Sequence, residues 1–395
     1  MIGKWLSVLG ALCLSGNANC ASLTDEKLTK LVADTRAQYE IPALAVVVVN
    51  AEQVMLSAVQ GNRSIDNNQP VKLGDFFHIG SGAKSILSVV AGYLVETGKL
   101  RWDSRFFDYF PELLVVADQR YRSITLEQLL GMRAGIPLFD SWQQIGLIGA
   151  TAPAEKDPFI KHLLAMPPET QPDGDGFAFG YSNASPLLAA SMLEKVSGQE
   201  WRSLVENVMA EQLNINIRYG WPDSNDGSHV EGHARSGQGI MGVWQQSPAV
   251  DPRVSGQVGD LFAIKPDMPY RLPEVVAPAG DFQVSVNDYA RYAQFHLRGA
   301  MGLDGAISAE TIQYIHNRYP EVSLGMLSND DWGTKIIGMD GSAGTFVSHM
   351  MVIPEQNMAY VILANSGTEQ ALEGVSDLSA KLIKQQLGLW WLLWI

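Results

Sequence analysis

Ser81 and Lys84 are three residues apart in a stretch whose apolar residues recur at helical spacing. On a helix, this spacing places a hydroxyl and an amine on one face, about one turn apart. A serine hydroxyl needs a base within hydrogen-bond reach to act as a nucleophile, and a lysine is such a base only when it is neutral. The pair is therefore a candidate nucleophile beside a possible base, and its structural alternative is an ordinary turn of a surface helix.

A second candidate segment is Tyr181-Ser182-Asn183, which comes just before an apolar run that starts at Pro186 and has helical character. Tyr181 can relay a proton between the nucleophile and the leaving group, and Asn183 can offer its amide to a substrate carbonyl. The alternative is an N-terminal helix turn in which Asn183 or Ser185 is the cap.

The elements that must position these residues come from both ends of the chain. Runs rich in β-forming residues predict one hairpin at 44–59 and another at 346–363, each with a polar turn in its middle. Helical patterns cover 25–39, 85–98, 125–132, 186–197, 199–213, 285–297, 309–318 and 371–386. We therefore predict an α+β fold, in which an antiparallel sheet built from both chain ends is packed by helices and a helical subdomain is inserted.

Two regions with weak periodicity separate these elements. Residues 140–180 and 220–280 are rich in Gly, Pro, Asp and Ser, and we interpret both as long loops around a cleft between the sheet and the helical subdomain. Such a cleft is the natural place for a site.

Residues 80–85 read Gly-Ser-Gly-Ala-Lys-Ser, and residues 94–100 read Leu-Val-Glu-Thr-Gly-Lys-Leu. Together they resemble the first motif block of the β-lactamase and penicillin-binding-protein superfamily. The resemblance is to the branch that holds class C β-lactamases, D-alanyl-D-alanine peptidases and family VIII carboxylesterases. Tyr181-Ser182-Asn183 is similar to the tyrosine motif of that branch, and the similarity runs in the same order from about residue 25 to about residue 385.

The resemblance implies roles for these residues. Ser81 would be the acylated nucleophile, Lys84 its neighbour in proton transfer and Tyr181 the base or proton relay, with Asn183 at the substrate amide or carbonyl. The division of the base role between Lys84 and Tyr181 stays open. Phe139 stands where some relatives carry a polar substrate-binding side chain; an aromatic ring there suits an apolar acyl group, and a core role is the alternative.

The third motif of the family is a lysine or histidine, any residue, and then glycine, and here that place holds Met339-Asp340-Gly341. The backbone N–H of Ser342 would still pair with that of Ser81 as an oxyanion hole, because a backbone donor does not depend on the side chain before it. A cation that attracts a substrate carboxylate is missing. We therefore expect a preference for neutral acyl esters or amides, with Met339 and Gly341 lining the substrate site.

Composition excludes several classes of partner. The chain has 28 basic and 42 acidic residues, a net charge of −14, and no basic cluster, which argues against nucleic-acid binding. No glycine-rich phosphate-binding loop occurs, and we expect no cofactor. His229 and His233 are four residues apart, as helical metal ligands can be, but the surrounding Gly- and Asp-rich sequence favours a loop, so we expect no metal.

The two chain ends differ in composition from the rest of the chain. Residues 1–21 combine a lysine, a short apolar run and small residues, which predicts a secretory signal and an exported, periplasmic or secreted protein. Residues 22–386 form the predicted hydrolase domain. The tail at 387–395 is apolar and rich in tryptophan, which suits docking on the core or a partner, or peripheral contact with a membrane surface.

These features favour an exported serine hydrolase whose partner is a small-molecule ester, amide or peptide substrate, with an esterase as the leading hypothesis. A D-alanyl-D-alanine peptidase or class C-type β-lactamase is the alternative within enzymes. A binding or scaffold protein that keeps the fold with a weakened site is the alternative from another class.

Overall fold

The computed structural model describes residues 23–139, 156–221, 229–235, 259–265, 272–330 and 334–387. The predicted signal at 1–21 and the tryptophan-rich residues that follow 387 lie outside this part of the chain. Across these described ranges, no helix has both the length and the apolar character needed to cross a bilayer.

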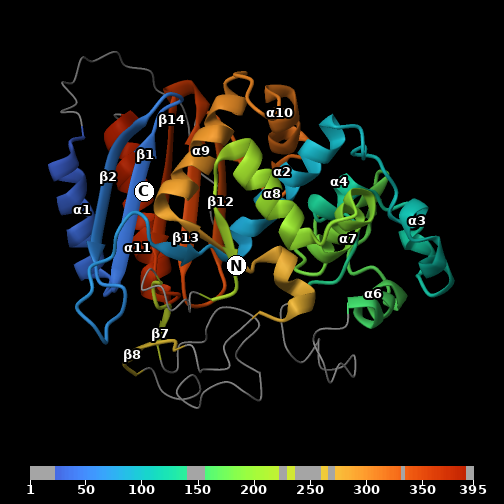
Figure 1. Cartoon of the computed structure of the whole chain (residues 1–395), viewed down its shortest axis with the longest axis horizontal. Coiled ribbons are helices and arrows are strands. Elements are labelled where there is room, and N and C mark those ends of the chain that lie inside the picture. The colour runs from blue at the N-terminus through green and yellow to red at the C-terminus, as the bar shows by residue number, and fades with distance from the viewer. Residues whose placement is uncertain are drawn as a thin grey trace.

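A seven-stranded antiparallel sheet forms the larger half of the molecule, with the strand order β10-β11-β12-β13-β14-β1-β2 (Figure 1). The N-terminal hairpin pairs β1 with β2, the C-terminal hairpin pairs β13 with β14, and β1 lies beside β14. The predicted α+β class is therefore confirmed, with strands from both chain ends joined in one sheet. The strands are β1 (Ala43–Val49), β2 (Val54–Gly61), β10 (Glu321–Val322), β11 (Leu327–Asn329), β12 (Ile336–Ser342), β13 (Val347–Ile353) and β14 (Met358–Ala364).

Strand β1, which lies between β14 and β2, is buried along its whole length because helices cover both faces of the sheet. Its side chains alternate between two cores, as the two-residue period of a strand requires. Ala45 and Val47 belong to the large core on the side of α9 (Val286–Ala300), whereas Leu44 and Val46 belong to the core beneath α1 (Asp25–Gln38) and α11 (Glu369–Leu387). This double burial explains why the strand reads as an unbroken apolar run.

The other half of the molecule is helical, and α2 runs through it almost entirely buried. Every helix expected from periodicity is present. The helices of this half and of its border with the sheet are α2 (Ala83–Glu96), α3 (Phe106–Tyr109), α4 (Leu126–Leu130), α6 (Lys156–Ala165), α7 (Ser185–Ser197), α8 (Trp201–Leu213) and α10 (Ala309–Asn317).

The interpretation of 140–180 as a loop is wrong in its second part. Helix α6 occupies 156–165, and β4 (Pro172–Asp173) pairs with β5 (Gly176–Phe177) in a small hairpin. The helix forms because four residues at helical spacing are buried in the core: Phe159, Ile160, Leu163 and Leu164. In 220–280, the described residues likewise include a short strand pair, β7 (His233–Arg235) with β8 (Leu261–Ala263).

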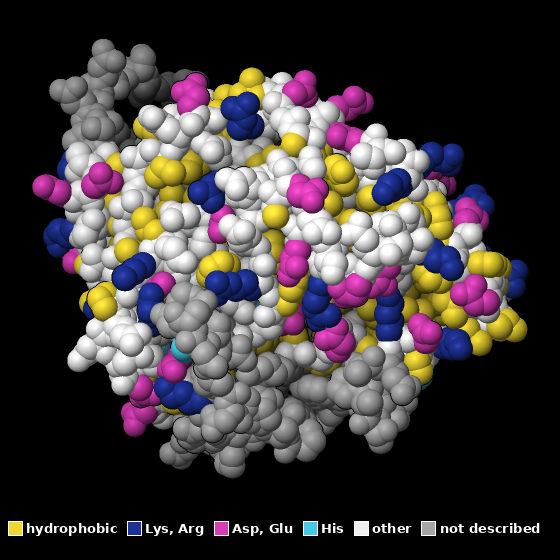
Figure 2. All heavy atoms as spheres, in the orientation of Figure 1, with side chains coloured by type: hydrophobic (Ala, Val, Ile, Leu, Met, Phe, Trp, Pro, Cys, Tyr) yellow, Lys and Arg dark blue, Asp and Glu magenta, His cyan; other side chains and the backbone are white. Residues whose placement is uncertain are grey.

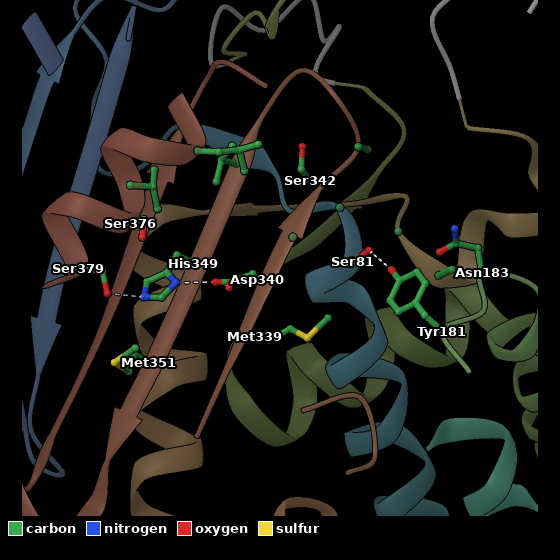
Figure 3. Close-up of a pocket in the computed structure, with 18 of the residues that line it drawn as sticks. Ser81, Tyr181, Asn183, Met339, Asp340, Ser342, His349, Met351, Ser376 and Ser379 are labelled. Atoms are coloured by element: carbon green, nitrogen blue, oxygen red, sulfur yellow. Dashed lines mark hydrogen bonds and ion pairs between the residues drawn. The ribbon is translucent and has the colours of Figure 1, made fainter. Parts of the chain in front are cut away.

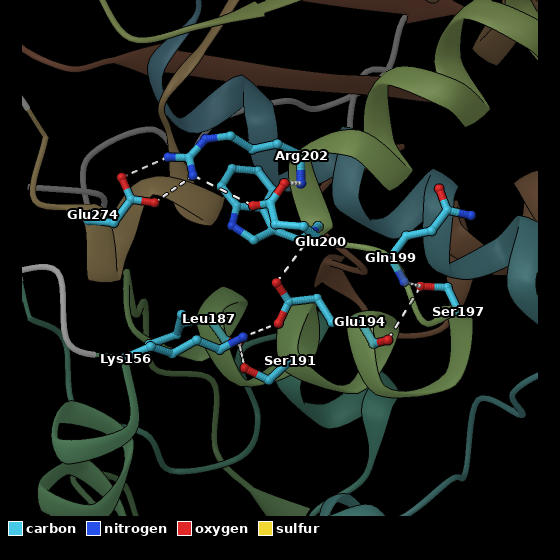
Figure 4. A network of polar contacts seen from close by, with 10 residues as sticks. Lys156, Leu187, Ser191, Glu194, Ser197, Gln199, Glu200, Arg202 and Glu274 are labelled. Atoms are coloured by element: carbon cyan, nitrogen blue, oxygen red, sulfur yellow. Dashed lines mark hydrogen bonds and ion pairs between the residues drawn. The ribbon is translucent and has the colours of Figure 1, made fainter.

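A network of charged residues ties the helices to the segment that borders the site (Figure 4). Lys156 of α6 pairs with Glu194 of α7, and Glu194 also accepts the backbone N–H of Trp201 at 3.2 Å. Arg202 of α8 donates to Glu274 at 2.8 Å. Glu274 begins the 3-10 helix Glu274–Ala279, so this ion pair holds the segment whose last carbonyl reaches the site.

A small three-stranded sheet, in the order β3-β9-β6, connects the two halves. Its strands are β3 (Phe76–His78), β9 (Phe282–Ser285) and β6 (Ile217–Tyr219), and β3 leads directly into the turn that carries Ser81. On the face shown in Figure 2, basic and acidic side chains are interspersed over the surface.

Candidate active site

Ser81 lies on the 3-10 turn Gly80–Gly82, between β3 and the first turn of α2. Gly80 has a φ of 50°, and its N–H donates to His78 Nδ1 at 3.2 Å. A Cβ at Gly80 would lie 2.7 Å from the backbone nitrogen of Ser342, so only glycine permits this close approach. The turn is thereby fixed against the end of β12.

The Ser81 hydroxyl is part of a tight hydrogen-bonded cluster, and Figure 3 shows its contact with Tyr181. Its oxygen lies 2.6 Å from Tyr181 Oη. Lys84 Nζ donates to Tyr181 Oη at 2.8 Å and to Ser81 Oγ at 3.2 Å. The predicted nucleophile, amine and phenol are therefore brought together within direct hydrogen-bond reach, although they come from segments 100 residues apart.

Lys84 is buried, with 3% of its surface exposed, and neutral oxygens surround its amine. Besides Ser81 and Tyr181, it donates to Asn183 Oδ1 at 3.0 Å and to the Ala279 carbonyl at 3.0 Å. None of these four acceptors is a carboxylate. The dipoles of these four groups, rather than a carboxylate, thus stabilise a positive charge on Lys84. The charged amine in turn stabilises negative charge that forms on the oxygens beside it.

Asn183 is free for the site because another residue makes the turn that precedes α7. The Ser182 hydroxyl accepts the N–H groups of Ala184 at 3.2 Å and Ser185 at 3.0 Å. The alternative interpretation of this segment had Asn183 or Ser185 as the N-cap of the helix. Neither residue is the cap, so that choice of residue is wrong. Asn183 Oδ1 faces Lys84, and its NH2 group is left to donate to a ligand in the cavity that Asn183 lines.

The end of β12 packs directly on the Ser81 turn. A Cβ at Gly341 would lie 2.0 Å from the Ile79 carbonyl oxygen and 2.6 Å from the Gly82 nitrogen. Ser348 of β13 donates to the same Ile79 carbonyl at 2.8 Å. The Ser342 hydroxyl donates back to Phe346 O at 2.7 Å, so its side chain is occupied within its own hairpin. This contact brings the backbones around Ser81 and Ser342 together, as an oxyanion hole requires.

These residues open into a cavity of about 830 Å³ that extends from Ser81 and Tyr181 to residues of α11. Met339 is 7% exposed and presents its thioether to the cavity. Among the described residues that line the cavity, none is a lysine or an arginine. The lining residues are Gly80, Ser81, Leu138, Tyr181, Asn183, Leu272, Val276, Ala279, Gly280, Met339, Asp340, Gly341, Ser342, Ala343, Val347, His349, Met351, Leu372, Val375, Ser376, Ser379, Ala380 and Ile383.

Phe139 lies elsewhere. It is 2% exposed and packs edge-on against Phe159 of α6 at 5.1 Å between ring centroids, so it is in the core and not on the described cavity wall. Its neighbour Leu138 lines the cavity. The missed helix α6 explains the difference, because it provides the partner that draws Phe139 inward.

Two histidines have partners that their sequence spacing does not reveal. The Nδ1 atom of His349 lies 2.5 Å from Asp340 Oδ1, because the register of β12 and β13 places these residues opposite each other. His233 accepts the Ile65 N–H at 3.2 Å on Nε2, and its Nδ1 lies 2.6 Å from the Asn365 carbonyl. Backbone groups therefore occupy both ring nitrogens of His233.

Comparisons with known proteins agree on one family. The family model described as Beta-lactamase matches residues 28–382. The chain is 22% identical to the unguisins hydrolase ungD of Aspergillus violaceofuscus (strain CBS 115571) over 94% of this chain and 66% of that protein, so it spans about two thirds of that relative. It is 23% identical to penicillin-binding protein 4 of Amycolatopsis lactamdurans, over 79% of this chain and 77% of that protein.

Among solved structures, the class C beta lactamase from Rhodobacter sphaeroides superposes with a TM-score of 0.65 and 17% identity, over 90% of this chain and 99% of that one. At this identity, the likeness shows the fold.

Proposed function

The chain belongs to the β-lactamase family of serine hydrolases, and from this premise we propose that it is an esterase for neutral acyl substrates that works through an acyl-enzyme on Ser81. The observation that carries the proposal is a cavity wall whose described residues include no lysine or arginine. Met339, which lines this cavity, stands where the family has a cation. A substrate carboxylate would be desolvated there without a cationic partner, which costs free energy that a neutral ester does not lose.

The first chemical step follows from the hydrogen-bonded cluster. In the reactive form of the site, Tyr181 is a phenolate whose negative charge the Lys84 ammonium balances. Ser81 Oγ attacks the ester carbonyl carbon, and the serine proton passes to the phenolate Oη of Tyr181, 2.6 Å away. Negative charge collects on the carbonyl oxygen, where the backbone N–H groups of Ser81 and Ser342 donate to it. Lys84 stabilises Tyr181 while that residue carries the negative charge, at 2.8 Å.

Breakdown of this intermediate completes acylation. The C–O bond to the alcohol breaks, and Tyr181 returns the proton to the leaving oxygen. Water then attacks the acyl-enzyme by the same route in reverse, giving the acid and free Ser81. Asn183 holds an acyl-group carbonyl or amide with its NH2 group.

A substrate panel tests the proposal. The full chain is assayed with a short-chain nitrophenyl ester and with a chromogenic cephalosporin, whose reactive ring stands beside a carboxylate. We expect kcat/KM for the ester to exceed that for the cephalosporin by at least about tenfold, since one unpaired charge costs more than about 1.4 kcal/mol. Faster turnover of the cephalosporin would instead favour a β-lactamase or peptidase. No turnover of either substrate would favour a scaffold.

A further inference from the structure

A second serine in the same cavity has the partners of an activated nucleophile. Ser379 Oγ lies 3.0 Å from His349 Nε2, and His349 Nδ1 lies 2.5 Å from Asp340 Oδ1 (Figure 3). The order is hydroxyl, imidazole and carboxylate, each within hydrogen-bond reach of the next. This order is the arrangement by which a serine is activated in unrelated hydrolases.

Three separate elements build this group, which we name the α11 triad: Asp340 of β12, His349 of β13 and Ser379 of α11. The strand register sets Asp340 directly opposite His349, and both side chains lie on the sheet face that α11 covers. The imidazole is nearly buried, with 12% of its side chain exposed, whereas 67% of the Asp340 side chain is exposed. The sheet and the helix therefore fix the ring in place.

The hydrogen-bond pattern supports one direction for the protons. A carboxylate only accepts, so His349 Nδ1–H donates to Asp340 and Nε2 is left to accept the Ser379 hydroxyl. On the other side, Tyr360 Oη lies 2.8 Å from Ser379 Oγ and donates its own proton to Met351 Sδ at 2.9 Å. The free lone pair of His349 Nε2, 3.0 Å away, is therefore the base that can take the Ser379 proton.

Ser379 is 5% exposed, and it borders a cavity. It lines the cavity of about 830 Å³ that Ser81 lines, although the two serines lie on opposite sides of β12. The cavity wall around it is apolar, and Val375 and Ile383 of α11 line the same space one turn away on either side. An activated ester or phosphonate with a short alkyl chain suits these surroundings.

We propose that Ser379 is a second nucleophile of this protein. It takes up the acyl group of an activated short-chain ester or the phosphonyl group of an activated short-chain phosphonate. With an alkyl fluorophosphonate, Ser379 Oγ attacks phosphorus, the O–P bond forms, the P–F bond breaks and fluoride leaves. The serine proton passes to His349 Nε2 and from there to water. This inference is independent of the role of Ser81, because it uses none of the groups around Ser81.

The reaction at Ser379 is slower than at Ser81 for two reasons. The solvated Asp340 carboxylate orients the imidazole less strongly than a buried one does. Ser379 also lies inside α11, where its backbone N–H takes part in the helix and is not available to an oxyanion. We expect a labelling rate about 10² to 10³ times below that of Ser81, as loss of one oxyanion-hole donor produces.

The test is peptide mapping by mass spectrometry after treatment with an alkyl fluorophosphonate. In full-length Ser81→Ala, the Ser379 peptide should gain the phosphonyl mass over hours. Asp340→Asn in that background should slow the gain at least about tenfold, and His349→Asn should abolish it. Ser376→Ala is the matched control: it is one turn away in the same cavity, and its labelling should equal that of Ser81→Ala alone.

Circular dichroism verifies that each variant is folded, and the exposed Asp340→Asn change tests the triad even if His349→Asn unfolds the chain. The proposal is overturned if folded Ser81→Ala shows no adduct on the Ser379 peptide. It is also overturned if the adduct forms equally fast in the Asp340→Asn variant. Labelling of the Ser81 peptide is measured separately in the wild type, so absence of an adduct on the Ser379 peptide would not contradict the esterase proposal.

Discussion

The Tyr181 phenol oxygen lies 2.6 Å from the Ser81 hydroxyl oxygen, and the Lys84 amine donates to both. This geometry gives Tyr181 the shortest path for the serine proton, while Lys84 has three further oxygen partners that hold it in place. We therefore assign proton transfer to Tyr181 and charge stabilisation to Lys84, a division that residue spacing left open.

Tyr181→Phe removes the proton carrier and keeps the ring. Since general acid–base groups contribute about 10² to 10⁴ in rate, we expect kcat for a nitrophenyl ester to fall at least about 10²-fold, with KM changed less than about threefold. Tyr93→Phe, at a partly buried tyrosine that packs on the core away from the site, should leave both parameters unchanged. Equal kinetics in Tyr181→Phe and the wild type would remove Tyr181 from the mechanism.

Met339→Lys restores a cation at the cavity wall. A charged hydrogen bond contributes about 1.5 to 3 kcal/mol, so the ratio of cephalosporin to ester kcat/KM should rise at least about tenfold. Met339→Leu is the neutral control and should leave the ratio within about twofold. If the lysine and leucine variants give the same ratio, Met339 does not face the substrate.

Gly341→Ala tests the packing of β12 on the Ser81 turn. Its methyl group would lie 2.0 Å from the Ile79 carbonyl oxygen, so the strand must move away. We expect a loss of about 1 to 3 kcal/mol in the free energy of unfolding and a larger fall in kcat, because Ser342 moves with the strand. Gly74→Ala is the control, since no atom lies within 4 Å of a Cβ there. Urea unfolding and ester kinetics are measured for both variants. Equal unfolding free energies and equal kcat values in Gly341→Ala and Gly74→Ala would contradict the close contact between Gly341 and the Ser81 turn.

Burial lowers the pKa of His233 to about 4 in the folded chain, against about 6.5 for an exposed histidine. As the pH falls below 6.5, the unfolded chain takes up a proton that the folded chain does not, so stability decreases until about pH 4. The loss at this one site is about 3 kcal/mol.

Substitution of His233 isolates this contribution. His233→Gln lacks the titrating group, so the difference in unfolding free energy between wild type and variant should shrink by about 3 kcal/mol between pH 7 and pH 4. Urea unfolding across this range measures it. A difference that stays constant with pH would show that His233 does not titrate between the two states. Burial also lowers the pKa of His296 to about 3, but that residue is present in both proteins and cancels.

Local patterns predicted most of the fold. Strand β1 and the helix at 83–96 carry strong signals because they are buried, and therefore apolar, along most of their length. The helix at 286–300 carries a strong signal because its buried residues recur at helical spacing. Helix α6 was missed because its apolar residues are embedded in a stretch rich in Gly, Pro and Asp, and tertiary packing rather than local composition stabilises it.

The candidate site, like the fold, was predictable from the sequence only in part. Ser81, Lys84 and Tyr181 are found from motifs, but the distances among them depend on how α2 and the segment before α7 meet. The pairing of Asp340 with His349 depends on the register of β12 and β13, and a hairpin alignment of 336–342 against 347–353 would have revealed it. The approach of Ser379 depends on the rotation of α11 about its axis, which periodicity does not determine.

The central claim is tested most directly by acid-quenched mass spectrometry of the full-length protein during turnover of nitrophenyl butyrate. We predict a butyryl group on the peptide that contains Ser81 within the first turnovers, and none on that peptide in Ser81→Ala, whose hydrolysis should fall at least about 10³-fold. Hydrolysis by the wild type without an acylated Ser81 peptide, or at an equal rate in Ser81→Ala, would contradict the account.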